Sequence, residues 1–303
     1  MSAIERLAAE VARLGELRTA EPLARHTTFG VGGPADLFLT VRSADALAAA
    51  SAAAADADVP VFILGSGSNI LVADAGIRGL VIDNRAGAEF LDGTTVRIES
   101  GASFAAFARR MCRRGLDGLA WAVGIPGTLG GAVVYNAGAY GGCLADVLRR
   151  VRVQLPGGRA EWVDAAHLHL VYRGSRFTRG ELRGRAVLEC ELELSPGDPA
   201  ELLRRAAAYD ARRLAAQPRG RSAGSTFKNP PEAPAWKLID AVGMRGMRRG
   251  DAAISEKHAN FFVNEGNATA ADLRWLIEEA RRRVFETFGI TLEPEVEFVG
   301  AWT

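Results

Sequence analysis

A glycine-rich stretch at residues 121–142, WAVGIPGTLGGAVVYNAGAYGG, constrains this chain more than any other feature. Seven of its 22 residues are glycine, and it contains no charged side chain. Glycine loses backbone entropy on folding and adds no packing, so this density predicts a backbone that turns sharply or lies flat against something. A solvated loop is usually polar. The lack of charge therefore favours a backbone surface built against a flat, largely apolar ligand over an ordinary turn region.

The size and charge of the chain exclude several classes of protein. Its 303 residues are enough for two or three domains with a buried core. With 37 basic and 36 acidic residues, the net charge of +1 argues against binding to nucleic acid or a membrane surface. We find no apolar segment of membrane-spanning length and no signal peptide. We expect a cytoplasmic protein, and a monomer or a weak oligomer.

Cysteine and histidine usage predicts no metal site. The three cysteines are odd in number and far apart, with neither metal-ligand spacing nor a disulfide framework, as expected in a reducing compartment. His26, His167 and His169 do not form a ligand cluster.

The apolar pattern of the first part of the chain predicts both helices and strands. An amphipathic helix with a Ser2–Glu5 capping box begins the chain. Ser43 begins an alanine-rich helix that ends near Ala57, and residues 59–64 form a short buried strand.

The middle of the chain is predicted to be rich in strands. We expect strands at 95–100 and 185–194 and a hairpin over 151–164, with one helix that begins after Ser103. A linker at 195–199 follows.

The last part of the chain is again mixed. Helices are predicted at 235–243 and at about 270–288, the second with a Thr269–Asp272 capping pair. The segment 254–267 contains a strand.

The segment GSGSNILV at 65–72 follows a predicted strand directly. It is not a Rossmann fingerprint, because Ile70 holds the third glycine position and no helix pattern follows, and no P-loop motif occurs in the chain. Small residues still allow successive backbone N–H groups to bind a pyrophosphate. By itself this signal is weak, since serine and glycine also make ordinary turns.

Seven segments in order resemble one family, the UDP-N-acetylenolpyruvoylglucosamine reductases, which are flavoenzymes of bacterial peptidoglycan precursor synthesis. The matching segments are TTFGVGGPADLF, LGSGSNILV, GIPGTLGGAVVYNAGAYG, YRGSRF, AGSTFKNP, SEKHANFFVN and LEPEVEFVG. They cover nearly the whole chain, and the ordered set is highly specific. The chain resembles the short type of the family, because the tyrosine-bearing insertion of the long type is not found.

The resemblance implies an α+β architecture: a two-subdomain FAD-binding fold of the vanillyl-alcohol-oxidase / p-cresol methylhydroxylase type, followed by a C-terminal α+β substrate domain. The expected FAD-binding subdomains are 1–84, completed by 290–303, and 85–198, with FAD between them. The substrate domain is expected at 199–289.

The resemblance also implies noncovalent FAD, with NADPH as the hydride donor. The loop at 65–69 is expected to hold the pyrophosphate, and the glycine-rich stretch to line the flavin and the adenine portion. The implied cofactor-binding residues are Gly65, Ser66, Gly67, Ser68, Asn69, Gly124, Ile125, Pro126, Gly127, Thr128, Gly131, Ala132, Asn136, Ala137 and Gly138.

The implied reaction is reduction of the enolpyruvyl ether of a UDP-sugar to UDP-N-acetylmuramate. Hydride passes from NADPH through FAD to the terminal enolpyruvyl carbon, and the negative charge that develops needs preorganised donors and then a proton. The resemblance assigns binding of the substrate carboxylate to Arg173, stabilisation of the enolic intermediate to Glu295 and proton donation to Ser225. Without the motifs, these residues would be a surface arginine, an exposed strand glutamate and a turn serine.

Candidate contacts to the UDP-sugar are lysines, amides and rings near these motifs. Lys228 and Asn229 follow Ser225 within the same motif and are the best candidates, while Lys237 and Lys257 are weaker ones. Tyr172 is also a candidate, although packing explains it better than chemistry. His258 is equally well explained as a histidine packed at a strand edge.

Two alternatives differ in cofactor attachment or in activity. An oxidase of the same fold with covalent FAD would need a histidine or cysteine tether, for which only Cys143 is placed. A nucleotide-sugar-binding protein that lost catalysis is the second alternative, and the joint presence of Arg173, Ser225 and Glu295 argues against it.

Overall fold

The computed structural model describes residues 2–302, apart from the side chain of Pro156. The chain divides into two compact units. Unit 1 consists of the residues up to 19 together with 36–65 and 79–212. Unit 2 consists of 20–35, 66–78 and the residues from 213 onward. No helix within the described residues is both long and apolar enough to cross a membrane.

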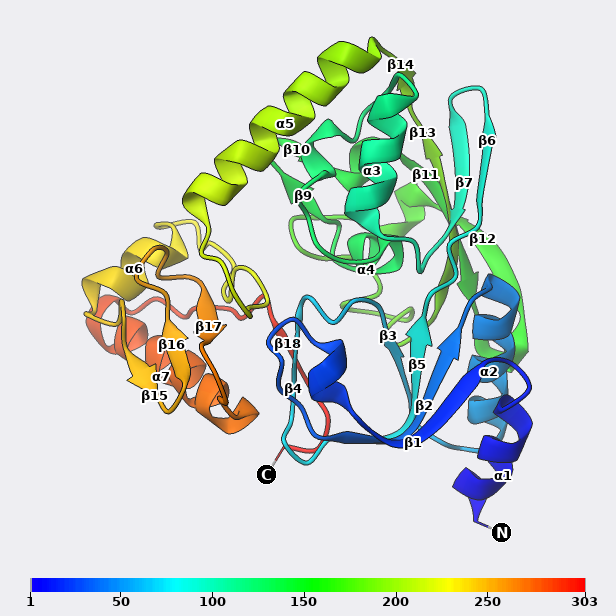
Figure 1. Ribbon diagram of the computed structural model, residues 1–303, viewed down its shortest axis with the longest axis horizontal. Helices are drawn as coiled ribbons and strands as arrows, with labels where there is room; N and C mark the ends of the chain where they lie inside the picture. The colour runs from blue at the N-terminus through cyan, green and yellow to red at the C-terminus, as the bar shows by residue number, and fades with distance from the viewer. Residues whose placement is uncertain (1, 303) are drawn as a thin grey trace. The chain divides into compact units, whose positions relative to one another are not determined.

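Unit 1 is built around a five-stranded antiparallel sheet and a four-stranded sheet (Figure 1). The larger sheet has the strand order β12-β11-β13-β7-β6. Its strands are β6 (Glu89–Asp92), β7 (Thr95–Glu99), β11 (Leu148–Gln154), β12 (Ala160–Asp164) and β13 (Val187–Glu193). The smaller sheet has the strand order β1-β2-β5-β3. Its strands are β1 (Glu16–Pro22), β2 (Pro34–Val41), β3 (Val61–Leu64) and β5 (Ile77–Asn84). Two-residue pairs complete the unit: β8 (Leu116–Asp117) with β14 (Ser195–Pro196), and β9 (Gly138–Ala139) with β10 (Gly142–Cys143).

Three helices of unit 1 begin at caps that the sequence predicts. The helices of this unit are α1 (Ala3–Val11), α2 (Ala44–Asp56), α3 (Phe104–Arg113), α4 (Leu129–Val134) and most of α5 (Pro199–Ala216), with 3-10 turns η2 (Ala120–Ala122), η3 (Leu144–Asp146), η4 (Pro156–Gly158) and η5 (Ala165–Leu168). The Ser2–Glu5 capping box and the Ser43 and Ser103 caps are confirmed. Each supplies an oxygen to a backbone N–H that the helix itself leaves unpaired.

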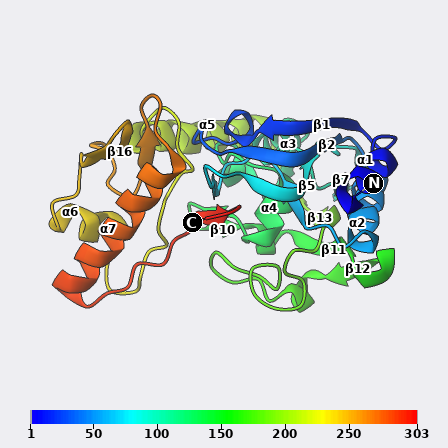
Figure 2. The same ribbon diagram turned by 90° about the horizontal axis from the view of Figure 1, so that it is seen from below.

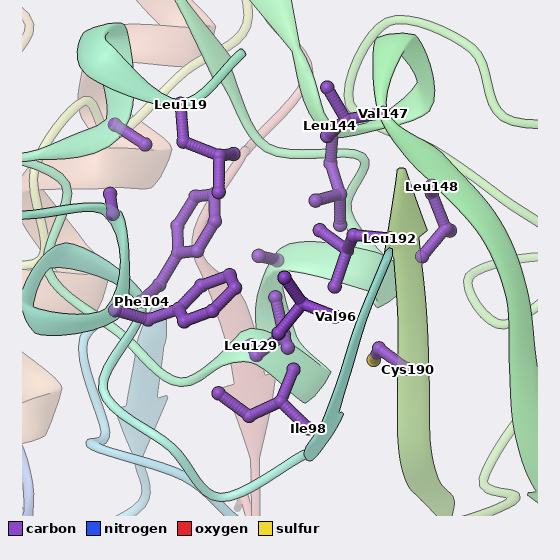
Figure 3. Packing of buried hydrophobic residues seen from close by; sticks show 14 of the residues in the cluster. Val96, Ile98, Phe104, Leu119, Leu129, Leu144, Val147, Leu148, Cys190 and Leu192 are labelled. Atoms are coloured by element: carbon purple, nitrogen blue, oxygen red, sulfur yellow. The ribbon is translucent and has the colours of Figure 1, made fainter. Parts of the chain in front are cut away.

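The main core of unit 1 lies between α3, α4 and the larger sheet. Phe104 of α3 and Leu129 of α4 point toward Val96 and Ile98 of β7 and Leu192 of β13 (Figure 3). All five side chains are at most 1% exposed. The periodic apolar face of α3 and the alternation along β7 therefore meet as their sequences predict.

The glycine-rich stretch contains more regular structure than predicted. It forms η2, α4, β9 and β10, and Gly130 lies inside α4. A Cβ on Gly130 would lie 3.1 Å from Ser100 Cβ, and one on Gly142 would lie 2.5 Å from Trp121 Cδ1. Several of these glycines therefore allow close packing within the protein, which the sequence does not distinguish from packing against a ligand.

Unit 2 places α7 (Ala270–Phe288) against the three-stranded sheet β15-β16-β17 (Figures 1 and 2). The remaining bounds are η1 (Leu23–His26), β4 (Ile70–Val72), α6 (Ala235–Ala241), β15 (Arg248–Arg249), β16 (Ala252–Ile254), β17 (Phe262–Asn264) and β18 (Glu297–Val299). Strand β18 pairs in parallel with β4, although more than 200 positions separate them.

Loss of the α7 cap tests the capping box of unit 2. Thr269 accepts from the backbone N–H of Asp272, and the Asp272 carboxylate accepts from the Thr269 N–H. We expect Thr269→Ala to lower the free energy of unfolding by about 1 kcal/mol, as for other lost N-caps. Urea denaturation followed by circular dichroism measures this, with Thr269→Ser as the matched control. A loss in Thr269→Ser equal to that in Thr269→Ala would contradict the capping role.

Candidate functional site

The loop at 65–69 has a backbone that requires glycine and leaves N–H groups available. Gly67 has φ +63°, and a Cβ there would lie 2.1 Å from the His26 carbonyl oxygen. Within residues 2–302, the N–H groups of Ser66, Gly67 and Asn69 donate to no protein acceptor. Unpaired N–H groups on a turn of small residues are suited to bind an anion such as a pyrophosphate.

Gly65 lies directly against the glycine-rich stretch within unit 1. A Cβ on Gly65 would lie 2.4 Å from Thr128 Oγ1, so this contact requires glycine. The structure thus brings together two predicted cofactor residues that are 63 positions apart in the sequence.

The predicted cofactor residues of the glycine-rich stretch differ in how the protein uses them. Gly124, Ile125, Pro126, Gly127 and Thr128 connect η2 to α4, whereas Gly131 and Ala132 lie in α4, Asn136 and Ala137 follow it, and Gly138 begins β9. Gly131 is exposed, and the nearest protein atom to an added Cβ would be Thr128 Oγ1 at 3.7 Å. The protein itself therefore gives no steric reason for glycine at 131. Gly127, in contrast, has φ +130° and needs glycine for its backbone.

Arg173 lies in a tight turn of unit 1. The Val171 N–H donates to the Gly174 carbonyl oxygen at 2.9 Å, and the Gly174 N–H donates to the Val171 carbonyl oxygen at 3.2 Å. Arg173 has φ +53°, and its guanidinium lies 5.3 Å from the centre of the exposed Tyr172 ring. A left-handed arginine is uncommon and is held only where the surrounding structure enforces it.

Ser225 and Glu295 are brought to neighbouring segments in unit 2. The Thr226 N–H donates to the Asn260 carbonyl oxygen at 2.8 Å, and the Thr226 carbonyl oxygen accepts from the Glu295 N–H at 2.8 Å. Ser225 forms an isolated antiparallel bridge with Phe261. Within the described part of the chain, Ser225 Oγ has no hydrogen-bond partner, so the hydroxyl is available to a ligand.

Two asparagine side chains support this arrangement, and the sequence did not single out their supporting roles. Asn260 is 3% exposed and bonds to both the N–H and the carbonyl oxygen of Phe227 at 2.9 and 2.8 Å. Asn69 Nδ2 donates to the Glu295 carbonyl oxygen at 3.0 Å. The signal for Asn260 was a lone polar residue inside the apolar run HANFFV, which favours a buried amide bonded to backbone.

Lys228 and Asn229 already have partners in the protein. Lys228 Nζ lies 2.6 Å from Glu293 Oε1, and Asn229 Oδ1 accepts from the Ala235 N–H at the start of α6. Lys237 is exposed and lies 5.6 Å from the centre of the Trp236 ring. Each lysine would exchange or share its partner on binding a phosphate.

His258 is half-buried among rings. It lies 4.9 Å from Phe261 and 6.3 Å from Trp236 between ring centres, and its Nδ1 accepts from the Asn260 N–H at 3.3 Å. Burial is the largest cause of its lowered pKa, and the charge of Arg245 lowers the pKa further. The acceptor role of Nδ1 requires a neutral ring with the proton on Nε2.

A separate open pocket of about 850 Å³ lies in unit 2, and neither Ser225 nor Glu295 lines it. Its basic lining residues include Arg248, which pairs with Glu265, and Lys257, whose Nζ donates to the Leu214 carbonyl oxygen. The pocket is not proposed as the reaction site, because neither proposed catalytic residue of this unit lines it.

Comparisons with known proteins find relatives over nearly the whole chain. A family model of the UDP-N-acetylenolpyruvoylglucosamine reductase C-terminal domain matches residues 216–299, and a model of an FAD binding domain matches residues 35–164. UDP-N-acetylenolpyruvoylglucosamine reductase 2 of Symbiobacterium thermophilum is 43% identical over 98% of this chain and 96% of its own length. The reductase of Cereibacter sphaeroides is 45% identical over 94% of this chain and 96% of its own length.

Solved structures show the same fold. The crystal structure of UDP-N-acetylenolpyruvylglucosamine reductase from Thermus caldophilus has a TM-score of 0.80 and 37% identity, covering 93% of this chain and 99% of that one. A variant of Phl p 4, described as a glucose oxidase, has a TM-score of 0.50 at 16% identity, covering 66% of this chain and 45% of its own, and is similar in fold alone. The predicted class, an FAD-binding fold of the vanillyl-alcohol-oxidase type with a C-terminal α+β domain, is confirmed.

The lowered pKa of His258 predicts a pH dependence with a defined sign. The folded chain binds this proton less readily than the unfolded chain, whose histidine pKa is about 6.5. The contribution of His258 to stability is therefore present above about pH 6.5 and is lost as the pH falls below that value. An NMR titration of the ring proton, assigned with His258→Gln, should give a midpoint below that of the same residue in the urea-unfolded chain. A midpoint equal to or above the unfolded value would contradict the prediction.

Proposed function

This chain belongs to the UDP-N-acetylenolpyruvoylglucosamine reductase family, and we propose that it reduces the enolpyruvyl ether of UDP-N-acetylglucosamine enolpyruvate to UDP-N-acetylmuramate. The protein is an FAD-containing oxidoreductase with NADPH as hydride donor. The proposal is supported by the backbone bond between Thr226 and Glu295, which joins the segments that carry Ser225 and Glu295, in a chain related to such reductases over nearly its full length. The product is a peptidoglycan precursor, so the proposed role includes cell wall biogenesis, cell shape and cell division.

We assign FAD binding to the loop at 65–69 and to the glycine-rich stretch. The unpaired N–H groups of Ser66, Gly67 and Asn69 suit the pyrophosphate, and the open face at Gly131 suits a flat ring system. FAD, when bound, supplies the hydride for the reduction. The remaining residues of the proposed set are Gly65, Ser68, Gly124, Ile125, Pro126, Gly127, Thr128, Ala132, Asn136, Ala137 and Gly138.

Arg173 is proposed to bind the substrate carboxylate. Its guanidinium is permanently charged and planar, so it can donate two parallel hydrogen bonds to a carboxylate. The enforced backbone of the turn over 171–174 reduces the freedom lost on binding.

Ser225 is proposed to donate the proton and Glu295 to stabilise the enolic intermediate. The unpartnered Ser225 Oγ is free to face a substrate carbon, and a carbanion-like intermediate is a base strong enough to take the proton of a weakly acidic hydroxyl. The bonds of Thr226 to Glu295 and to Asn260 hold both functional residues before substrate binds.

The proposed substrate-binding set is Tyr172, Lys228, Asn229, Lys237 and His258. Lys228 is one-quarter exposed, and the side chain of Glu293 is 69% exposed, so exchanging this partner for a diphosphate leaves the carboxylate in water. A neutral His258 offers an Nε2 donor rather than a charge.

Noncovalent attachment of FAD is supported by the chemistry of Cys143. Burial raises the pKa of this thiol, and Asp146, whose Oδ1 lies 3.3 Å from Sγ, raises the pKa further. The thiolate is the nucleophilic form, so a raised pKa disfavours a covalent tether to the flavin.

The remaining parts of the proposal concern cellular context and domains. We propose a cytoplasmic monomer or weak oligomer that acts on a UDP-sugar and NADPH, without nucleic-acid or membrane partners. The balanced net charge of +1 supports this. We also propose FAD-binding subdomains at 1–84, completed by 290–303, and at 85–198, with the substrate domain at 199–289.

Removal of the Ser225 hydroxyl tests its role as proton donor, because it should affect reduction of the substrate and not reduction of the flavin. We expect Ser225→Ala to leave flavin reduction by NADPH nearly unchanged and to slow flavin reoxidation by the enolpyruvyl UDP-sugar about 10²- to 10⁴-fold. Anaerobic stopped-flow absorbance measures both steps, with Ser222→Ala in the same segment as a matched control. Equal losses in both steps would make Ser225 structural, and a wild-type protein whose reduced flavin is not reoxidised would refute the reductase function.

A bulky residue at Gly131 tests the cofactor surface. We expect Gly131→Leu to weaken FAD binding about 10-fold or more while leaving the thermal midpoint of the apoprotein unchanged, because the space beside Gly131 holds no close protein atom. Gly87→Leu is the matched control, since Gly87 is also exposed, lacks a positive φ and has no protein atom closer than 3.8 Å to an added Cβ. Fluorescence titration of apoprotein with FAD measures the affinity. Unchanged affinity in Gly131→Leu would remove this surface from the cofactor site.

A further inference from the structure

The turn that presents Arg173 is tied to the glycine-rich stretch by two side chains. Asn136 Nδ2 donates to the Val171 carbonyl oxygen at 3.2 Å, at the first residue of the turn. Ser175 Oγ donates to the Val134 carbonyl oxygen at 2.6 Å, one residue after the turn. Both ends of the turn are therefore bonded to the short segment 134–136.

Asn136 is itself held in one orientation. It is 6% exposed and has φ +42°, and its Oδ1 accepts from the Ala145 N–H at 3.0 Å. One amide thus donates to the turn and accepts from η3, which no carboxylate can do because an ionised carboxylate has no donor. These two bonds give Asn136 a structural role in addition to its proposed place in the cofactor site.

Ser175 is fully buried, and its hydroxyl both donates and accepts a hydrogen bond. Its Oγ donates to Val134 and accepts from the Phe177 N–H at 3.1 Å. Thr178, in contrast, bonds only within its own turn: its Oγ1 accepts from the Ser175 N–H and donates to the Ser175 carbonyl oxygen. Thr178 therefore stabilises the local turn without linking it to the glycine-rich stretch.

We propose that Asn136 and Ser175 are positioning residues that hold Arg173 in its left-handed conformation against the glycine-rich stretch, in the geometry needed to bind the substrate carboxylate. The inference rests on the proposed function of Arg173. An arginine side chain has many rotamers, and binding a carboxylate already costs the freedom of those rotamers. A fixed backbone at Arg173 avoids a further loss of freedom on binding and so favours affinity for the carboxylate. The two bonds fix that backbone to the same segment that is proposed to line the cofactor.

A pair of ligands with and without the carboxylate-bearing group tests this role on the FAD-loaded protein. UDP-N-acetylmuramate carries a lactyl ether that ends in the carboxylate, and UDP-N-acetylglucosamine lacks this whole group. Calorimetric titration gives the ratio of their affinities for each variant. We expect Ser175→Ala to weaken binding of the carboxylate ligand about 10-fold, with binding of UDP-N-acetylglucosamine unchanged within about twofold. Asn136→Asp should lower the ratio of the two affinities by about the same factor.

Three controls separate positioning from a general loss of structure. Thr178→Ala should keep the wild-type ratio of affinities, because it leaves both tethers intact. In an Arg173→Ala background, Asn136→Asp should cause no further loss, because it acts through Arg173. The rate of flavin reduction by NADPH should stay near that of wild type in Ser175→Ala, which serves as the second variant if Asn136→Asp does not hold FAD.

The outcomes distinguish this inference from the proposed function. If Arg173→Ala lowers the ratio of affinities but neither Asn136→Asp nor Ser175→Ala does, the positioning role is wrong and the function of Arg173 stands. Equal weakening of both ligands in the two variants also overturns the positioning role. If Arg173→Ala leaves the ratio unchanged, Arg173 does not bind the carboxylate, and both proposals fail.

Discussion

The backbone of Thr226 makes the contacts on which the arrangement of unit 2 depends. Its N–H bonds to Asn260 and its carbonyl oxygen accepts from Glu295, so three segments far apart in the sequence meet at one residue. Asn260 and Asn69 reinforce this meeting from either side. Backbone bonds and asparagine amides therefore hold together the segments that carry Ser225 and Glu295.

In unit 1, too, backbone contacts hold the candidate residues in place. Glycines allow segments to approach closely, and a tight turn fixes Arg173. Glycine at 65 allows close contact with Thr128, and glycine at 130 allows contact with Ser100. The Arg173 turn is bonded to the end of α4 by Asn136 and Ser175. The glycine-rich stretch is thus a packed part of the protein that also leaves open space beside Gly131 and Gly141.

Sequence patterns predicted the local elements well because their causes are local. Caps at Ser2, Ser43 and Thr269 and the apolar face of α3 appear where the pattern places them. The pattern was less informative for the glycine-rich stretch, where a six-residue helix forms. Glycine disfavours a helix by propensity alone, but close contact with Ser100 outweighs propensity at Gly130.

The sequence by itself determined the family, the FAD-binding fold and the identity of the candidate residues, because ordered motifs over the whole chain leave few alternatives. Only the tertiary structure decided which of those residues already form ion pairs or hydrogen bonds within the protein. Lys228 pairs with Glu293, His258 is neutral among rings, and Asn136 bonds to the Arg173 turn rather than standing free. Such partners come from residues distant in sequence, and burial and hydrogen bonding depend on that long-range packing, which no local pattern encodes.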